Sequence, residues 1–552
     1  MSLYNDASLL LIPSGYKSGK LYSQKPTDGS GDLTFTRASN ATRVNSDGLI
    51  EGVRTNLYLR SNEFNLWSKS GTFTVTANDA ISPDGTLNAD RVEFTASNNL
   101  LYLGATGASG SNTLSVYAKA KNGISAKFRF FSNGNTLSSS DQTATGEWQR
   151  FTFTYTYSAV TAGLQAATTG ADDILFYGFQ QEVSPSATDY IPTTTTAVSV
   201  GMLANVPRID YTGDLCGKLL LEKQSTNLIT YSEDFSNVDW SKYNVTITAN
   251  VTTSPDGTIN ASKYLDSTTN DTHNLYKAFS ISGDTTFSIY VKSAEYTRFA
   301  ITNLSDGGDV LFNLSTVAVI STSGNFQNGK IDSIGNGWYR VSATTNGTSG
   351  GKAIGFSLVN NSGATSFVGT GTKGVYVWGA QAEASSYPAS YIPTLASSVT
   401  RLADAGTTNI ASSVNASEGV LFLDYQPLNV STSFPVDFQL QYNGTNAVNG
   451  VTIYHSGNTP AVTVRSGGNI IFEQALTATT VGTRNKIALA YKGSDFAVYQ
   501  NGLQKGTQSS GVAPAALNEL RLSDGLRDFS INQAIIFPTR LTNAQLATLT
   551  TL

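Results

Sequence analysis

Hydrophobic and polar residues alternate in short runs along most of the chain. Residues 151–157 read Phe-Thr-Phe-Thr-Tyr-Thr-Tyr, and residues 486–492 place Ile, Leu and Tyr at every second position. A period of two sends alternate side chains to opposite faces of a β-strand. A further run at 496–500 ends in Asn501-Gly502, the dipeptide preferred in type I′ hairpin turns. These patterns predict antiparallel strands with one buried face.

The end of the chain carries a helical pattern. Residues 529–537 predict a last strand that Pro538 stops. Thr542 and Gln545 have the spacing of a capping box, in which each side chain bonds the other residue's backbone N–H. Leu546 and Leu549 then share one face, so we expect a short C-terminal helix.

A large part of the chain is repeated. Thr-Asn-Leu at 55–57 returns at 226–228, Ser-Pro-Asp-Gly-Thr at 82–86 returns at 254–258, and Tyr-Ile-Pro-Thr at 190–193 returns at 391–394. A unit of roughly 150 to 190 residues far exceeds the period of solenoids, so each copy should be a complete domain. The second copy is longer between Lys292 and Trp338, and we expect its additional residues in loops.

The predicted fold class is therefore all-β, with tandem antiparallel β-sandwiches: two related jelly rolls and a third sandwich of another kind. The predicted domains are an N-terminal attachment region at 1–52, the first sandwich at 53–200, the second at 201–405 and the third at 406–552. The N-terminal region is open to a second interpretation, as an extension of the first sandwich.

An arginine and an acidic residue follow each copy of the repeat. Arg208 precedes Asp210, and Arg401 precedes Asp404. We interpret both as interdomain braces in which an arginine contacts a carboxylate; the alternative is a ligand site.

Composition excludes several classes of function. Only 14% of the 552 residues are charged, the net charge is -5 and no basic run occurs, so nucleic-acid binding is not expected. No apolar run reaches the ~18 residues of a membrane span, and the N-terminus lacks the basic start of a signal peptide, so we expect no membrane insertion. A single cysteine, Cys216, excludes an intrachain disulfide framework.

Candidate catalytic and metal-binding residues are few. Asp172-Asp173 and Glu233-Asp234 are adjacent pairs, which a strand would point to opposite faces, so we predict no catalytic residues, no enzyme and no cofactor. His273 lies in a different domain from His455 and neither has a nucleophile motif nearby. Metal sites are not predicted.

Two Asp-Gly pairs have the residue types found in calcium-binding loops. Asp84-Gly85 and Asp256-Gly257 fit either calcium loops or simple β-turns, and we favour turns.

Sugar recognition is the remaining site chemistry. Lectin-type sites combine an exposed aromatic ring with Asn, Asp or Arg hydrogen bonds. Trp148, Trp338 and Trp378 lie in strand contexts, which predicts core positions. Tyr454 and His455 precede Ser-Gly-Asn and are predicted to lie in an exposed loop, which makes them the candidate ligand-binding residues.

Two parts of the chain resemble sugar-binding folds. Residues 486–502, 531–537 and 541–546 resemble the end of a concanavalin A-like (laminin G-like) lectin domain. The repeated units, with Trp67 or Trp240 ahead of Ser-Pro-Asp-Gly-Thr, resemble jelly-roll carbohydrate-binding modules.

The opening of the chain, at 11–22 and 35–44, resembles the start of structural proteins of tailed bacteriophages, which tend to continue with the Thr-Asn-Leu and Tyr-Ser-Glu-Asp-Phe block found at 226–235. This resemblance implies a virion protein made in the host bacterial cytoplasm, with other virion proteins and host cell-surface polysaccharide as partners. We predict a tail fibre or receptor-binding protein that contacts host surface glycans, and a homotrimer because phage appendages are usually trimeric. The alternative is a head fibre, capsid decoration or collar protein with a purely structural role; a third possibility, a depolymerase, needs carboxylates that converge at a subunit interface.

Overall fold

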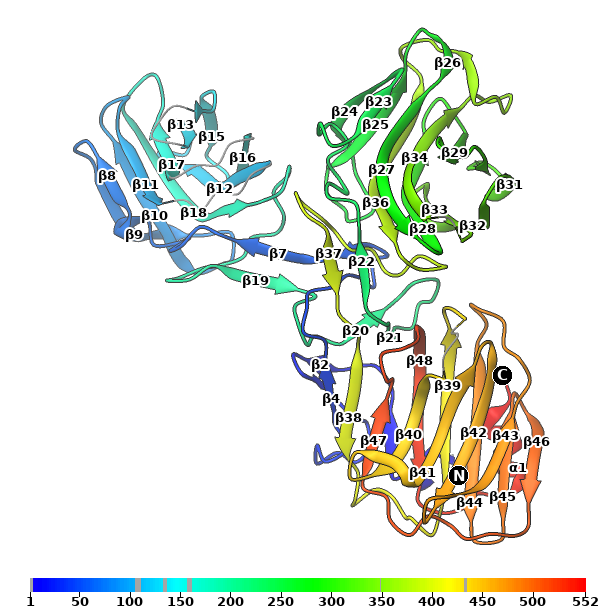
Figure 1. Ribbon diagram of the computed structural model, residues 1–552. Helices are drawn as coiled ribbons and strands as arrows, with labels where there is room; N and C mark the ends of the chain where they lie inside the picture. The colour runs from blue at the N-terminus through cyan, green and yellow to red at the C-terminus, as the bar shows by residue number, and fades with distance from the viewer. Residues whose placement is uncertain (1–2, 105–110, 133–136, 156–160, 348, 431–433) are drawn as a thin grey trace.

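The structure is a computed structural model that describes residues 3–104, 111–132, 137–155, 161–347, 349–430 and 434–552. Within these ranges the fold is all-β, as predicted: the helical elements are α1 (Asn543–Thr550), η1 (Leu3–Asp6) and η2 (Phe64–Leu66). Figure 1 shows three β-sandwiches, with two above and the C-terminal one below. In these ranges no helix is long and apolar enough to cross a membrane.

The first of the upper sandwiches, sandwich 1, has two antiparallel sheets around an aromatic-rich core. One sheet contains β9 (Thr74–Ile81), β10 (Leu87–Phe94), β12 (Asn112–Ala120), β16 (Gln149–Tyr155) and β18 (Asp172–Glu182). The other contains β8 (Ser68–Ser70), β11 (Leu100–Gly104), β13 (Ser125–Ser132), β14 (Leu137–Ser138), β15 (Gln142–Thr145) and β17 (Thr161–Ala166). In β16 the aromatic residues face inward and the threonines face outward, as the alternation predicts; positions 156 and 157 of that run lie outside the described residues.

The second upper sandwich, sandwich 2, repeats this plan. One sheet contains β23 (Ser241–Tyr243), β27 (Asn274–Ser282), β29 (Arg298–Asn303), β30 (Asp309–Asn313), β31 (Ala318–Thr322) and β34 (Ser349–Val359). The other contains β24 (Val245–Thr252), β25 (Ala261–Asp266), β28 (Thr285–Ser293), β32 (Phe326–Gly335), β33 (Trp338–Thr345) and β36 (Gly374–Glu383). The additional residues before Trp338, expected in loops, instead include strands, because Val310, Phe312 and Phe326 bury their side chains in the core.

The C-terminal sandwich draws strands from three distant parts of the chain. Its eight-stranded sheet contains β1 (Leu9–Leu11), β20 (Arg208–Asp210), β21 (Lys218–Leu221), β39 (Glu418–Pro427), β44 (Asn485–Lys492), β45 (Phe496–Gln500), β46 (Leu503–Gln508) and β48 (Phe529–Phe537). Its nine-stranded sheet contains β2 (Tyr16–Lys17), β3 (Lys20–Leu21), β4 (Leu33–Thr36), β38 (Ala405–Asn409), β40 (Val436–Tyr442), β41 (Thr445–Ser456), β42 (Thr459–Ser466), β43 (Asn469–Ala475) and β47 (Glu519–Leu522).

The N-terminal segment is thus part of the C-terminal sandwich, neither a separate region nor an extension of sandwich 1. β1 pairs with β48, and β4 pairs with β38. Leu33 and Phe35 of β4 are buried while Thr34 and Thr36 are exposed, so the strand adds its apolar face to the core between the two sheets. The hydrophobic effect therefore holds the start of the chain against its end.

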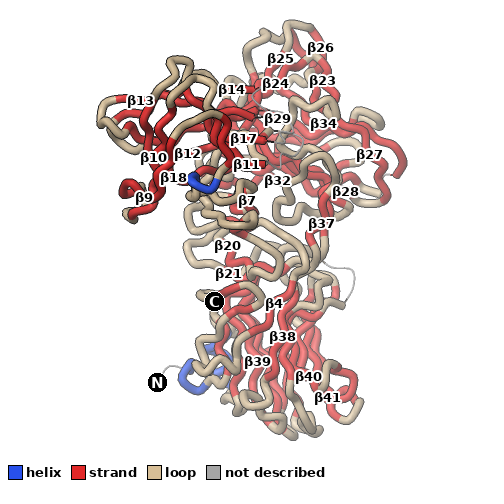
Figure 2. Tube along the Cα trace, turned by 90° about the vertical axis from the view of Figure 1, so that its left-hand side faces the viewer, coloured by secondary structure: helices blue, strands red, loops and turns tan. Residues whose placement is uncertain are grey.

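Two short two-stranded ribbons join the sandwiches, and Figure 2 labels a strand of each between the upper and lower parts of the molecule. They are β7 (Val53–Asn56) with β19 (Val198–Gly201), and β22 (Ser225–Asn227) with β37 (Val399–Arg401). Two further two-stranded pairs are the hairpin of β5 (Arg43–Val44) with β6 (Ile50–Glu51), and β26 (Asn270–Thr272) with β35 (Ser366–Val368) within sandwich 2. The repeated Thr-Asn-Leu has a structural reason: the Asn56 and Asn227 amides each donate, at 2.8 Å, to the carbonyl of the isoleucine in the repeated Tyr-Ile-Pro-Thr.

Two local predictions are confirmed at the end of the chain. Asn501 and Gly502 both have positive φ, 50° and 82°, as a type I′ turn requires. The Thr542 and Gln545 side chains form the predicted capping box of α1, whose Leu546 and Leu549 pack on the outer face of the eight-stranded sheet.

Candidate functional site

The candidate ligand residues from the sequence lie on β41, not in an exposed loop. His455 is fully buried: its Nδ1 contacts the Asp437 carboxylate and its Nε2 lies 3.1 Å from the Tyr425 hydroxyl. Burial lowers the pKa of His455, and the Asp437 charge partly offsets this. Tyr454 points to the opposite face, is partly exposed and donates to Glu473 at 2.9 Å. The expectation that the two form one exposed site is wrong because they are strand neighbours.

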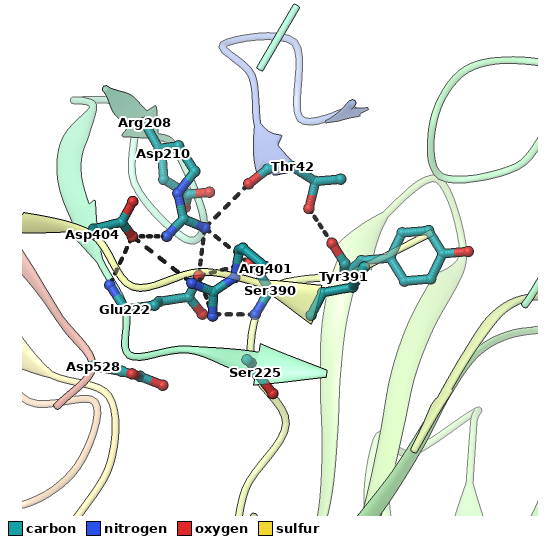
Figure 3. A network of polar contacts seen from close by, with 12 residues as sticks. Thr42, Arg208, Asp210, Glu222, Ser225, Ser390, Tyr391, Arg401, Asp404 and Asp528 are labelled. Carbon is teal, nitrogen blue, oxygen red and sulfur yellow. Dashed lines mark hydrogen bonds and ion pairs between the residues drawn. The ribbon is translucent and has the colours of Figure 1, made fainter. Parts of the chain in front are cut away.

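The arginines after each repeat meet in one buried network, shown in Figure 3. Arg208 contacts both Glu222 and Asp404, and Arg401 lies 3.5 Å from Glu222. Arg37, from the N-terminal segment, pairs with Asp404 at 3.1 Å. The predicted brace is confirmed, although Arg208 pairs with Glu222 of its own connecting segment and Asp404 of the second connector, and not with Asp210.

The network also reaches the C-terminal sandwich. Asp528, just before β48, accepts a hydrogen bond from the Lys223 N–H at 2.7 Å. Burial and the negative charge of Glu222 raise the pKa of Asp528 to about 7, against the opposing effect of Arg401. These contacts join the connectors to the C-terminal sandwich. Because the arginines and carboxylates of the network mostly pair with one another, we assign it a structural role.

A cleft of about 810 Å³ lies between sandwich 1, the β6–β7 segment and sandwich 2. This volume is within the roughly 300–1,000 Å³ typical of small-molecule sites. Sandwich 2 supplies the Tyr391–Leu395 stretch and a group of polar side chains around Glu233, Asp256 and Asn260, which we call the polar wall. Sandwich 1 supplies the turn after β18. Its lining includes Glu233, Asp256, Asn260, Trp378, Tyr391, Pro393 and Leu395.

The polar wall brings together a carboxyl pair that the sequence separates. Asn260 Nδ2 donates to Glu233 and to Asp256, at 3.3 Å each, and the Tyr391 hydroxyl donates to Glu233 at 2.9 Å. Burial, followed by the nearby charge of Asp256, raises the pKa of Glu233 to about 8. Near neutral pH, Glu233 is therefore a neutral acid that can donate a hydrogen bond.

Asp256 is held by its own turn. Its Oδ1 accepts hydrogen bonds from the Thr258 N–H at 2.8 Å, the Thr258 hydroxyl at 2.7 Å and the Ser254 hydroxyl at 2.6 Å. Asp84 makes the equivalent turn in sandwich 1. Both Asp-Gly pairs are simple turns, as favoured from the sequence, and no group of three potential metal ligands occurs in the described ranges.

Two buried polar atoms on the cleft wall have no partner within the described structure. They are Nε1 of Trp378, a donor, and Oδ1 of Asn260, an acceptor. Trp378 is 1% exposed and Asn260 4% exposed. An unpaired buried polar group costs about 1–3 kcal/mol, and both atoms lie beneath the surface of the cleft wall.

The tryptophans divide between core and surface. Trp338 and Trp378 are buried, as predicted, although they lie on the outer face of their sheet and not between the sheets. Trp148 is partly exposed.

Glu233 was not predicted as a site residue, because the sequence was read for the spacing between Glu233 and its neighbour Asp234. The signal that could have found it is that Glu233 stands where the first copy has Asn62.

No family model and no curated protein matches the chain. Solved structures with some likeness include the tandem CBM22 domains of Paenibacillus barcinonensis Xyn10C, at 13% identity over 60% of this chain and 97% of that one, with a TM-score of 0.22. The CBM40 of the Ruminococcus gnavus IT-sialidase bound to α2,3-sialyllactose is 14% identical over 25% of this chain and 84% of that one, with a TM-score of 0.22. A pentraxin from Limulus polyphemus is 13% identical over 24% of this chain and 69% of that one, with a TM-score of 0.20. At these TM-scores no role is transferred to this chain.

Proposed function

We propose that this protein binds a glycan in the cleft between sandwich 1 and sandwich 2, without catalysing a reaction. The observation that carries this proposal is the cleft of about 810 Å³ itself, whose lining sets the polar Glu233 and Asn260 beside the apolar Pro393 and Leu395. Small-molecule sites combine a few such polar side chains with an apolar surface.

The remaining wall suits the same ligand. Neutral Glu233 offers a further donor, and Pro393 and Leu395 provide an apolar surface for the C–H face of a sugar ring. Asp256 makes a poor nucleophile or general base, because Oδ1 is taken up by its turn and Oδ2 by Asn260. This arrangement supports binding without hydrolysis.

We further propose that the chain acts in a tailed-phage virion as a tail fibre or receptor-binding protein, and that its ligand is host cell-surface polysaccharide. The support is the resemblance of residues 11–44 and 226–235 to phage structural proteins. A homotrimer would add affinity through multivalency, and light scattering on the purified chain gives its mass.

The competing role is a head fibre, capsid decoration or collar protein. It is favoured by the N-terminal segment, because β1 and β4 are paired within the C-terminal sandwich and do not extend as an attachment arm. Electron cryo-microscopy of intact virions separates the two: density for the chain at the tail tip supports the receptor-binding role, and density on the capsid shell supports the structural one.

A glycan array probed with the full chain tests the binding itself. We expect retention on at least one bacterial surface polysaccharide. Absence of retention across the array would contradict the proposed function.

A further inference from the structure

An aromatic cluster on the outer face of sandwich 2 is covered by a hairpin from elsewhere in the chain. Ile50, at the start of β6, packs against Tyr290, Trp338, Trp378 and Tyr391. The Ile50 N–H also donates to the Pro255 carbonyl at 2.9 Å. The β5–β6 hairpin therefore docks through Ile50, through Val44, which packs against the same cluster, and through one backbone hydrogen bond.

Sandwich 1 carries the same cluster in the same register. Tyr117 lies opposite Tyr177 on one side and Arg150 on the other, as Tyr290 lies opposite Trp378 and Arg340. Each arginine stacks on its tyrosine, at 5.3 Å in sandwich 1 and 5.4 Å in sandwich 2.

The tryptophans of the two clusters match as well. Trp148 Nε1 donates to the Ile81 carbonyl at 3.1 Å, and Trp338 Nε1 donates to the Thr253 carbonyl at 3.0 Å. We call Tyr117, Trp148, Tyr177 and Tyr190, with Arg150, the aromatic face of sandwich 1.

This face is open where its counterpart is covered. Trp148, Tyr117 and Tyr190 are partly exposed, whereas Trp338 is 2% exposed. Ile81, beside Trp148, is 63% exposed. Among the described residues none donates to the carbonyl of Pro83, the counterpart of Pro255.

The chain's own hairpin cannot cover both faces. Phe35 before it is buried in the C-terminal sandwich, and Val53 to Asn56 after it are paired in the β7–β19 ribbon. Thr42 is bonded to the Tyr391 carbonyl beside the occupied face. This hairpin therefore leaves the face of sandwich 1 free for a segment of another polypeptide.

We propose that the aromatic face of sandwich 1 docks a β-hairpin of a partner protein, one that presents an aliphatic residue after an Asn/Asp/Gly turn as residues 45–50 do. The aliphatic side chain fills the space that Ile50 fills on sandwich 2, and its N–H donates to Pro83. The related face supplies the template, since it shows what an equivalent arrangement of rings and arginine, with Trp378 in place of Tyr177, packs against.

The test uses a backbone-cyclised, fluorescent peptide with the sequence of residues 43–51, added to the full chain. We expect saturable binding of this peptide to the wild-type chain. Its affinity should weaken at least about tenfold when the protein carries Trp148→Ala, and also when the isoleucine of the peptide is changed to aspartate.

Ile81→Asp is a second protein variant, at the edge of the same face. The matched control is Phe434→Ala, which removes a 68% exposed ring from the C-terminal sandwich and should keep binding.

Two outcomes would overturn the proposal. Peptide binding unchanged in both Trp148→Ala and Ile81→Asp would place the peptide elsewhere, including on the face that the chain's own hairpin covers. Failure of the peptide to bind, together with glycan retention that depends on Trp148, would make this face a sugar site.

Discussion

The Tyr391 hydroxyl donates a hydrogen bond to the Glu233 carboxyl at 2.9 Å, across 158 positions of sequence. Sandwich 1 has no such pair, because Asn62 occupies the position of Glu233 and its carbonyl oxygen accepts from the Gly178 N–H at 2.7 Å. At this position the two copies share a framework, but only sandwich 2 carries an ionisable group. That group faces the cleft between them.

Glu233 should make stability depend on pH. Its pKa is raised from about 4.5 to about 8, so between these values the folded protein keeps a proton that the unfolded chain releases. Stability due to this group is complete below about pH 4.5 and is lost as the pH rises to about 8. Denaturant unfolding of Glu233→Gln should lack this loss, whereas the partly exposed control Glu63→Gln should retain it. Equal pH profiles for Glu233→Gln and the wild type would contradict the assignment.

The buried network should be sensitive to loss of one partner. Arg208→Met removes the arginine that contacts both Glu222 and Asp404, which should lower the free energy of unfolding by about 3–5 kcal/mol. Lys330→Met, in the exposed pair with Asp332, is the control and should cost less than about 1 kcal/mol. Urea titrations compare the two, and similar losses would argue against a structural role for the network.

The N-terminal segment should stabilise the C-terminal sandwich. Phe35→Ala removes a buried ring from the core and should cost about 3–5 kcal/mol, while Thr34→Ala on the exposed side of the same strand should cost little. A fragment of residues 406–552 lacks β1–β4, β20 and β21, so circular dichroism should find it unfolded or aggregated. A cooperative unfolding transition of that fragment would contradict this view.

Local patterns predicted the elements whose determinants are close in sequence. Asn501-Gly502 requires only two positive φ angles, and the capping box of Thr542 needs a residue three positions away. The partners of β1 and β4 lie hundreds of residues further on, and nothing in a two-residue alternation specifies a partner strand. Tertiary pairing, and not local propensity, decided where the N-terminal segment belongs.

The candidate site was partly predictable. The repeated Ser-Pro-Asp-Gly-Thr predicted the Asp256 turn, and the repeat itself pointed to two equivalent positions. His455 was misplaced because the following Ser-Gly-Asn indicated a loop, whereas β41 continues through Ser456. Asn260 bridges Glu233 and Asp256, and its orientation depends on the tertiary structure. The local sequence around Glu233 therefore does not reveal that Asp256 lies nearby.

The cleft should bind polysaccharide without cleaving it. We expect no new reducing ends when the full chain is incubated with a polysaccharide that it retains, because Asp256 is committed to its turn. Reducing-end release that disappears in both Glu233→Gln and Asp256→Asn would instead identify a depolymerase.

The most direct test of the account is the affinity of a retained polysaccharide for a matched pair of variants. Asn260 and Asn88 occupy the same position in the two copies and both have a buried, unpartnered Oδ1, but only Asn260 lines the cleft. Titration calorimetry should find binding weakened about tenfold or more in Asn260→Ala and unchanged in Asn88→Ala. Equal affinity in the two variants would show that the glycan does not bind in this cleft.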